Sequence, residues 1–132
     1  MELKLPDYIV VIVEDLERSL KFYCQTLGLT LKHRAEAFAQ LETGATRLAL
    51  YTRSAMQDTL NMKLSAPAEN APGFELGFKV TDVDAAYQEL LAKGAPSVIQ
   101  PTDRPWGQRT AYVRDPDGHL IELAQDPASK AV

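Results

Sequence analysis

The sequence predicts an α+β protein built from two β-α-β-β-β modules in a chain of 132 residues. Two stretches, which begin at Tyr8 and Glu75, share one layout. In each, an aspartate follows seven positions after the first residue, and the helical pattern behind it ends at a glycine. Three strand-like runs follow each helix. Such internal similarity indicates two copies of one supersecondary unit.

The first copy opens with a run over 8–13 whose residues 10–13 are all β-branched, which favours a strand. Asp15 is expected to cap the helix over 16–27, because its short carboxylate can accept hydrogen bonds from the first-turn N–H groups. Apolar residues form one stripe of that helix, and Gly28 suits the left-handed backbone that ends it. Strands are predicted over 29–34, 38–42 and 47–52.

In the second copy, apolar residues alternate with polar or small ones over 75–80, as in a strand with one buried face. Asp82 is the expected cap of a helix over 83–93, which closes at Gly94. Further strands are predicted over 97–100, 110–114 and 120–124. The sequence Asp-Pro-Asp-Gly at 115–118 predicts a type I turn between the last two.

We expect a single domain over 1–132, with module one at about 5–52, a linker at 53–73 and module two at about 74–125. The linker contains Pro67 and Pro72 and has no clean periodicity. It is long for a loop inside a compact domain. A plain linker is favoured, and a flap over a pocket or a short helix are the alternatives.

Composition excludes several classes of protein. The net charge is −4 and the basic residues are scattered, which argues against nucleic-acid binding. No apolar run approaches the roughly 20 residues that span a bilayer, so no membrane partner is expected. Cys24 is the only cysteine and the N-terminus lacks the layout of a signal peptide. A cytoplasmic protein is therefore expected.

Two motifs resemble the glyoxalase–bleomycin resistance–dioxygenase superfamily, also called the vicinal oxygen chelate superfamily. They are the run over 13–23 with Leu27-Gly28-Leu29, and the run Asp115-Pro116-Asp117-Gly118-His119-Leu120-Ile121-Glu122-Leu123. The resemblance extends from about Tyr8 to about Ala124. It implies a glyoxalase-like open barrel, a concave pocket between the modules and a homodimer. The superfamily contains metalloenzymes as well as proteins that sequester bleomycin-type drugs, so the fold alone does not choose the function.

The resemblance also implies four metal-ligand positions, which in this sequence are Tyr8, Ala49, Glu75 and Glu122. Of these, Glu122 alone matches the metal-binding members. A neutral phenol is a poor ligand for a divalent ion, alanine offers none, and no imidazole is present. We therefore expect no metal and no cofactor, with a divalent metal as the less favoured alternative.

The two histidines do not change this expectation. His33 is predicted to be an exposed strand residue. His119 is predicted to be a solvent-exposed turn residue, on the opposite side of its strand from Glu122.

Strand alternation predicts a pocket that is partly aromatic and partly charged. Trp106 lies in a Pro-Trp-Gly loop like that of drug-sequestering relatives. The expected ligand-binding residues are Tyr8, Arg47, Ala49, Tyr51, Trp106 and Glu122. Such a pocket suits a small aromatic or cationic molecule. Three alternatives stay open: Trp106 packs within its loop, Arg47 and Glu122 form a structural ion pair, or Tyr8 fills the space of a lost metal.

Two functions follow, and the sequence leaves open whether the protein is an enzyme. The first is binding of a small aromatic or cationic molecule, with antibiotic sequestration as its specific form. The second is a lyase, isomerase or dioxygenase that uses a metal or the carboxylates Glu75 and Glu122 as catalytic groups. If these two carboxylates approach each other, they would share a proton and could move it on a bound substrate.

Overall fold

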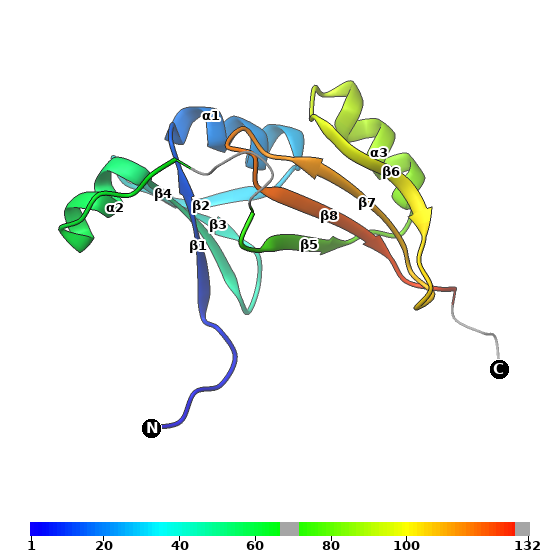
Figure 1. Cartoon of the computed structure of the whole chain (residues 1–132), viewed down its shortest axis with the longest axis horizontal. Coiled ribbons are helices and arrows are strands. Elements are labelled where there is room, and N and C mark those ends of the chain that lie inside the picture. The colour runs from blue at the N-terminus through cyan, green and yellow to red at the C-terminus, as the bar shows by residue number, and fades with distance from the viewer. Residues whose placement is uncertain (67–71, 129–132) are drawn as a thin grey trace. The chain divides into compact units, whose positions relative to one another are not determined.

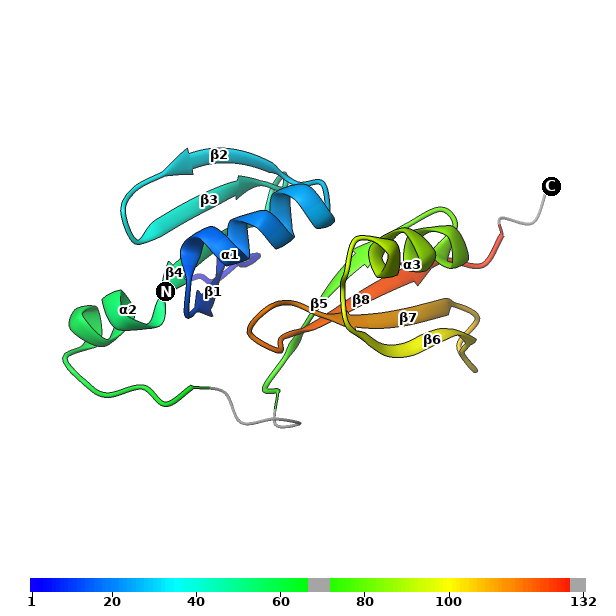
Figure 2. The same ribbon diagram turned by 90° about the horizontal axis from the view of Figure 1, so that it is seen from above.

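The computed structural model describes residues 1–66 and 72–128, which form two compact units, Met1–Ala66 and the part of Pro67–Val132 that begins at residue 72. Each unit contains one four-stranded sheet with a helix against it (Figures 1 and 2). Neither sheet closes on itself, and the strand orders are β1-β4-β3-β2 and β5-β8-β7-β6. The predicted α+β architecture of two β-α-β-β-β modules is confirmed.

The first unit contains seven elements. They are β1 (Tyr8–Val13), α1 (Leu16–Leu20), a π-helix η1 that continues α1 (Lys21–Thr26), β2 (Thr30–Arg34), β3 (Phe38–Glu42), β4 (Arg47–Thr52) and α2 (Arg53–Leu60). The Asp15 side chain accepts a hydrogen bond from the N–H of Arg18, as predicted for a helix cap. The predicted helix over 16–27 is therefore present, but its second half has the wider i→i+5 turns of a π-helix.

One face of the first sheet forms the core of its unit, because alternate residues of each strand point to that face. Val11, Leu41 and Leu50 on this face are fully buried, together with Tyr23 from the helix. β1 pairs with β4 in parallel, with Tyr8 opposite Arg47 and Val10 opposite Ala49. These two pairs lie on the other face of the sheet, where the parallel register makes the residues of each pair neighbours.

The second unit repeats this arrangement with β5 (Glu75–Lys79), α3 (Val83–Ala92), β6 (Ser97–Asp103), β7 (Arg109–Arg114) and β8 (Leu120–Gln125). Its core holds Val83 from the helix and Val113 and Ile121 from the sheet, all fully buried. β5 pairs with β8 in parallel. The pairs β8–β7 and β7–β6 are antiparallel.

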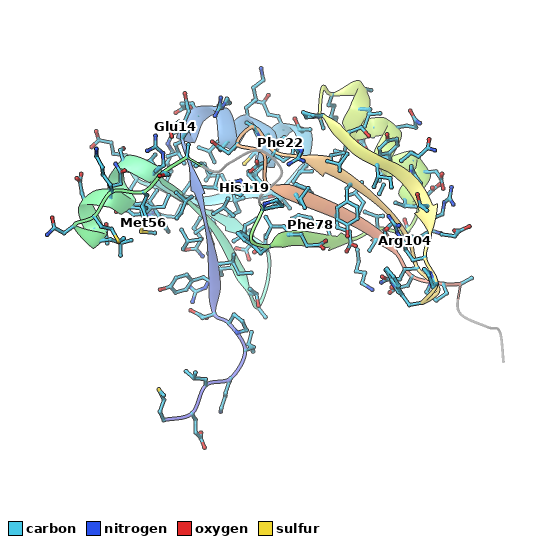
Figure 3. All side chains as sticks on the ribbon, in the orientation of Figure 1. Glu14, Phe22, Met56, Phe78, Arg104 and His119 are labelled. Carbon is cyan, nitrogen blue, oxygen red and sulfur yellow. The ribbon has the colours of Figure 1, made fainter. Side chains whose placement is uncertain are left out.

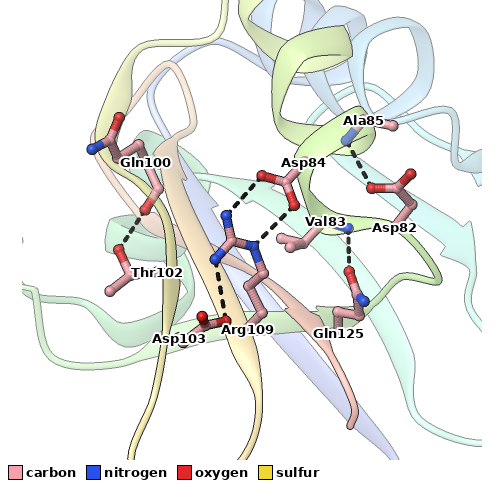
Figure 4. Close-up of polar contacts among 9 residues, drawn as sticks. All are labelled: Asp82, Val83, Asp84, Ala85, Gln100, Thr102, Asp103, Arg109 and Gln125. Atoms are coloured by element: carbon pink, nitrogen blue, oxygen red, sulfur yellow. Dashed lines mark hydrogen bonds and ion pairs between the residues drawn. The ribbon is translucent and has the colours of Figure 1, made fainter. Parts of the chain in front are cut away.

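Polar contacts hold the start of α3 against the second sheet (Figure 4). The Arg109 guanidinium donates two hydrogen bonds of 2.9 Å to Asp84 in the first turn of α3, and one of 3.1 Å to Asp103. The side chains of Asp82 and Gln125 accept hydrogen bonds from the N–H groups of Ala85 and Val83. These contacts satisfy first-turn donors that have no partner within the helix.

Two differences from the predicted elements have physical causes. β6 extends three residues beyond its predicted end and passes through Pro101, which is tolerated because β6 is an edge strand with two register shifts. The predicted linker is not plain, because its first part forms α2, capped by the side chain of Thr52. Its residues 67–71 lie outside the described residues.

Arg53 fixes α2 to its own unit. Its guanidinium donates to both carboxylate oxygens of Glu14, at 2.7 and 2.9 Å, and to the carbonyl of Leu64 at 3.0 Å. Glu14 lies where β1 ends (Figure 3). No helix among residues 1–66 and 72–128 is long and apolar enough to cross a membrane.

Candidate functional site

The face of the first sheet opposite to the one that forms the core carries a cavity of about 270 Å³. Its lining residues are Asp7, Tyr8, Phe38, Gln40, Arg47 and Ala49. Tyr8, Arg47 and Ala49 were predicted for the pocket, and the parallel register of β1 and β4 places them on one face. Ala49 is 2% exposed and Tyr8 is 62% exposed, so Ala49 is covered by its neighbours while the Tyr8 ring stands open.

Phe38 and Gln40 were missed by the sequence analysis. They lie on β3, where Gln40 is directly opposite Ala49 and Phe38 is opposite Tyr51. Alternation in β3 carries this signal, because Ala39 and Leu41 are buried on the other face.

Arg47 forms an ion pair with Asp7, at 2.5 Å between Nη2 and Oδ2. This contact lies within the first unit and at the surface, where such a pair is worth roughly 1 kcal/mol or less. The pair with Glu122, which the sequence analysis gave as an alternative for Arg47, would join the two units and stays a prediction.

Tyr51 lies on the same face of the sheet as the cavity. Its ring meets Phe38 edge to face, with 6.2 Å between ring centroids. Its hydroxyl lies 2.8 Å from the hydroxyl oxygen of Thr59, so the ring is tied to α2. Tyr51 therefore extends the aromatic part of this face, although it is not among the residues that line the cavity.

A β-bulge changes where His33 lies. The register shifts between Leu31 and His33, so His33 rather than Lys32 stands opposite Gln40. Directly opposite residues share one face of a sheet. His33 is exposed as predicted, but the bulge brings it to the face that carries the cavity.

In the second unit, Glu75 and Glu122 contact the same side chain, Tyr112. The Tyr112 hydroxyl lies 2.7 Å from Oε2 of Glu122 and 3.3 Å from Oε1 of Glu75. Burial, and then the hydrogen bonds to the two carboxylates, raise the pKa of Tyr112 above its ordinary value. The phenol is therefore a neutral donor at physiological pH.

Tyr112 was also missed. It stands directly opposite Glu122 on the neighbouring strand, and Gly77 stands opposite Glu122 on the other side. A Cβ atom on Gly77 would come within 3.2 Å of Oε1 of Glu122, so the glycine leaves room for the carboxylate. Within residues 72–128, neither Glu75 nor Glu122 forms an ion pair.

His119 is not the exposed turn residue that was predicted. Its side chain is 15% exposed, and Nδ1 lies 2.8 Å from Oδ2 of the buried Asp115 (His119 is labelled in Figure 3). The other carboxylate oxygen of Asp115 accepts hydrogen bonds from the backbone N–H groups of Asp117 and His119. Asp115, Asp117 and His119 each have one atom that could bind a metal ion, and these three atoms lie within 4.8 Å of one another. These contacts account for the cluster as part of the predicted turn, in which the N–H of Gly118 donates to the carbonyl of Asp115.

Trp106 lies in the turn between β6 and β7 and is 66% exposed, so its ring does not pack within the loop. Its indole N–H donates to Gln108 at 2.9 Å, and Gln108 donates to Asp126. The turn lies beyond the cross-strand pair Arg109–Gln125, and Gln125 is three residues along β8 from Glu122. At about 3.3 Å per residue this is roughly 10 Å, so Trp106 and Glu122 are not neighbours.

A second hollow, of about 370 Å³, lies where β5 and β8 end. It is lined by Lys79, Val80, Thr81, Gln125 and Asp126. Lys79 and Asp126 pair with each other, and the lining contains no aromatic ring. It therefore offers less to an organic ligand than the cavity of the first unit.

The residues at the four metal-ligand positions do not fit a transition-metal site. The first unit supplies a phenol and a methyl group, at Tyr8 and Ala49. The second supplies Glu75 and Glu122, and Tyr112 already donates to a Glu122 oxygen. None of the four positions is a histidine, whereas transition-metal sites of this kind use histidine with carboxylates.

Comparisons with known proteins agree with the fold and with the motifs. The family model described as the Glyoxalase/Bleomycin resistance protein/Dioxygenase superfamily matches residues 5–123. An uncharacterised protein of Bacillus subtilis (strain 168) is 36% identical, over 86% of this chain and 91% of the relative. A bleomycin resistance protein of Geobacillus stearothermophilus is 30% identical, over 86% of this chain and 90% of the relative.

Among solved structures, TnmS3, an antibiotic binding protein from Streptomyces sp. CB03234, superimposes with a TM-score of 0.71. It is 27% identical in sequence, and the match covers 97% of this chain and 99% of TnmS3.

Proposed function

The chain belongs to the glyoxalase/bleomycin resistance protein/dioxygenase superfamily, and we propose that its function within this family is to bind a small aromatic or cationic molecule. Antibiotic sequestration is the specific form of this proposal. The similarity to a bleomycin resistance protein and to an antibiotic binding protein supports the ligand class.

The aromatic cavity of the first unit carries the proposal. Its volume of about 270 Å³ is just below the roughly 300–1,000 Å³ typical of ligand pockets, so it suits one planar segment of a drug-sized molecule. The rings of Tyr8 and Phe38 line it, and Ala49 lets a flat ligand approach the sheet. Aromatic rings also attract cations through their faces.

The chemistry of the four family positions supports binding over metal-dependent catalysis. Tyr8 and Ala49 offer neither an imidazole nor a carboxylate, which leaves an incoming metal ion with Glu75 and Glu122. Stoichiometric zinc, nickel, cobalt, manganese or iron in the purified protein would contradict this reasoning. We further infer that the protein acts as a cytoplasmic homodimer, as the family resemblance and the single cysteine suggest.

Binding can be measured by isothermal titration calorimetry, which needs no reporter group beside the cavity. A metal-free bleomycin-type drug and a simple aromatic cation are titrated, and the shift of the melting temperature is a second readout. We expect Phe38→Ala to weaken binding by about fivefold or more, as for an aromatic anchor. The matched control is Phe74→Ala, because Phe74 is exposed and outside the cavity. Equal affinities for the two variants would contradict the proposed site, and no binding of either probe would contradict the function.

A second candidate function is metal-free proton transfer, and the contact of Glu75 and Glu122 with one phenol favours it. Such an enzyme would exchange an acidic C–H proton of a bound ligand with solvent, which proton NMR in D₂O detects. Glu122→Gln should abolish this exchange while the ligand still binds. Binding without any exchange in the unmodified protein would leave the binding function alone.

A further inference from the structure

We propose that Gln40 selects the ligand of the first unit: its side-chain amide pairs with a planar molecule whose edge carries a hydrogen-bond donor next to an acceptor, as in a primary carboxamide or a lactam. This inference rests on the proposed function, because it names the polar group of the aromatic ligand that the cavity takes. All residues that it uses lie in the first unit.

The strand pairing places Gln40 at the cavity. Ala39 and Leu41 are buried in the core, so alternation in β3 directs Gln40 to the opposite face, where it lines the cavity together with Phe38. Ala49 stands directly opposite Gln40 on β4. The methyl side chain of Ala49 occupies little space, so a flat ligand can lie beside the amide and against the Phe38 ring.

The two charged residues that line the cavity neutralise each other. Arg47 pairs with Asp7 at 2.5 Å, and the backbone carbonyl of Asp7 accepts the backbone N–H of Arg47 at 2.9 Å. An ion of either sign would have to share or break this pair, so net charge gives the cavity little selectivity. We therefore expect the neutral polar groups of the lining to select the ligand.

Those neutral groups are the Tyr8 hydroxyl and the Gln40 amide. The hydroxyl of the exposed Tyr8 can rotate and can either donate or accept, so it tolerates either kind of ligand group. The amide of Gln40 presents an oxygen acceptor and an NH₂ donor side by side, in whichever of its two orientations it lies. Within residues 1–66 this amide has no hydrogen-bond partner, and the residue is half-buried.

Burial by a ligand makes the amide selective. A flat ligand that lies on the sheet covers the amide and separates it from solvent. An edge with a donor next to an acceptor then supplies both hydrogen bonds, whereas a ligand with an acceptor alone leaves the amide oxygen without a donor. A site with a buried hydrogen-bonding group discriminates against ligands that lack the complementary group, because the unpaired group keeps its desolvation cost.

The test uses the full chain and three ligands that share one naphthalene ring. Their substituents are a primary carboxamide with a donor and an acceptor, a methyl ketone of similar shape with the acceptor alone, and an amidinium with donors only. Calorimetry measures each dissociation constant for the unmodified protein, for Gln40→Met and for Gln40→Glu. The melting temperature of each variant shows that it is folded.

The unmodified protein should bind the carboxamide about fivefold or more tightly than the ketone, as expected for one unpaired buried group. Gln40→Met keeps the length of the side chain without its amide and should reduce this ratio to within about twofold. Gln40→Glu offers acceptors only, so it should shift the ratio of amidinium to carboxamide affinity by about tenfold or more toward the amidinium. A role of Gln40 in stability alone would move neither ratio.

The matched controls are Gln25→Met and Gln25→Glu. Gln25 is an exposed glutamine of the same unit, and it lies on η1 and outside the cavity. Both controls should leave the two ratios within about twofold, as expected for a position without contact to the ligand.

Equal affinities of the unmodified protein for the carboxamide and the ketone would overturn the inference. Ratios that Gln40→Met and Gln40→Glu leave unchanged would also overturn it. In both cases the proposed function stands if the ligands bind and Phe38→Ala weakens their binding. If none of the three ligands binds, the inference and the proposed function are both overturned.

Discussion

Replacing Asp115 with alanine should destabilise the second unit by about 3 kcal/mol, because this buried carboxylate satisfies three donors at once. Oδ1 accepts the N–H of Asp117 at 3.0 Å and that of His119 at 2.8 Å, and Oδ2 lies 2.8 Å from Nδ1 of His119. The Asp115 side chain is fully buried, so alanine would leave a space with no replacement acceptor from the protein.

The magnitude follows from these contacts. Each buried donor left without a partner costs roughly 1–3 kcal/mol. Asp117 and His119 are only half-buried, so water can reach part of the space and the lower end of that range applies to each donor. Three donors then give about 3 kcal/mol, a large share of the roughly 5–15 kcal/mol that stabilises a typical domain.

Urea unfolding at pH 7, followed by the fluorescence of Trp106, measures this loss within the second unit itself. Asp126→Ala is the matched control: its carboxylate is exposed and pairs with Lys79, and its removal should cost at most about 1 kcal/mol. A loss below about 1 kcal/mol for Asp115→Ala, or one equal to that of the control, would refute the reasoning from buried donors.

Two further predictions concern His119 and Gly77. Burial lowers the pKa of His119, but the hydrogen bond and charge of Asp115 and the charge of Asp117 outweigh it, so the pKa of His119 is raised above its ordinary value of 6.5. The stability that protonated His119 contributes is therefore present below about pH 6.5 and lost as the pH rises through the raised value. The unmodified protein should lose more stability over this range than His119→Gln, and parallel pH curves from urea unfolding would contradict it. Gly77→Ala should displace the Glu122 carboxylate, because the added Cβ atom would lie 3.2 Å from its Oε1, and should weaken its hydrogen bond with Tyr112. Urea unfolding should register a loss of about 1 kcal/mol. Gly73→Ala, whose added Cβ atom meets no atom within 4 Å, is the control, and an equal loss in both variants would contradict this reasoning.

Local sequence signals predicted most of the fold. The two aspartate caps hold their helices as expected, since a cap depends on residues only three positions away. Strand alternation also predicted that Arg47, Ala49 and Tyr51 share one face, because the period of two is a property of each strand alone. The family resemblance added Tyr8 to the predicted pocket. A short helix in the linker was only an alternative to a plain linker, because 53–60 shows no strong apolar stripe and none of the α2 residues is buried.

Cross-strand partners were harder to predict. Phe38 and Tyr112 lie far along the chain from Ala49 and Glu122, and only the pairing of strands makes them neighbours. A one-residue shift in pairing turns every side chain of a strand to the other face. The bulge before His33 is such a shift, and nothing in the local pattern of 30–34 indicates it.

By itself, the sequence determined the two modules, the β-α-β-β-β order of their elements and their family, because these depend on local periodicity and on motifs at fixed spacing. Only the tertiary structure decided that Phe38 and Gln40 complete a cavity, that one phenol joins Glu75 and Glu122, and that His119 bonds to a buried carboxylate. The physical reason is that register and burial arise from contacts between distant segments, and these contacts set the chemistry of a side chain as much as its identity does.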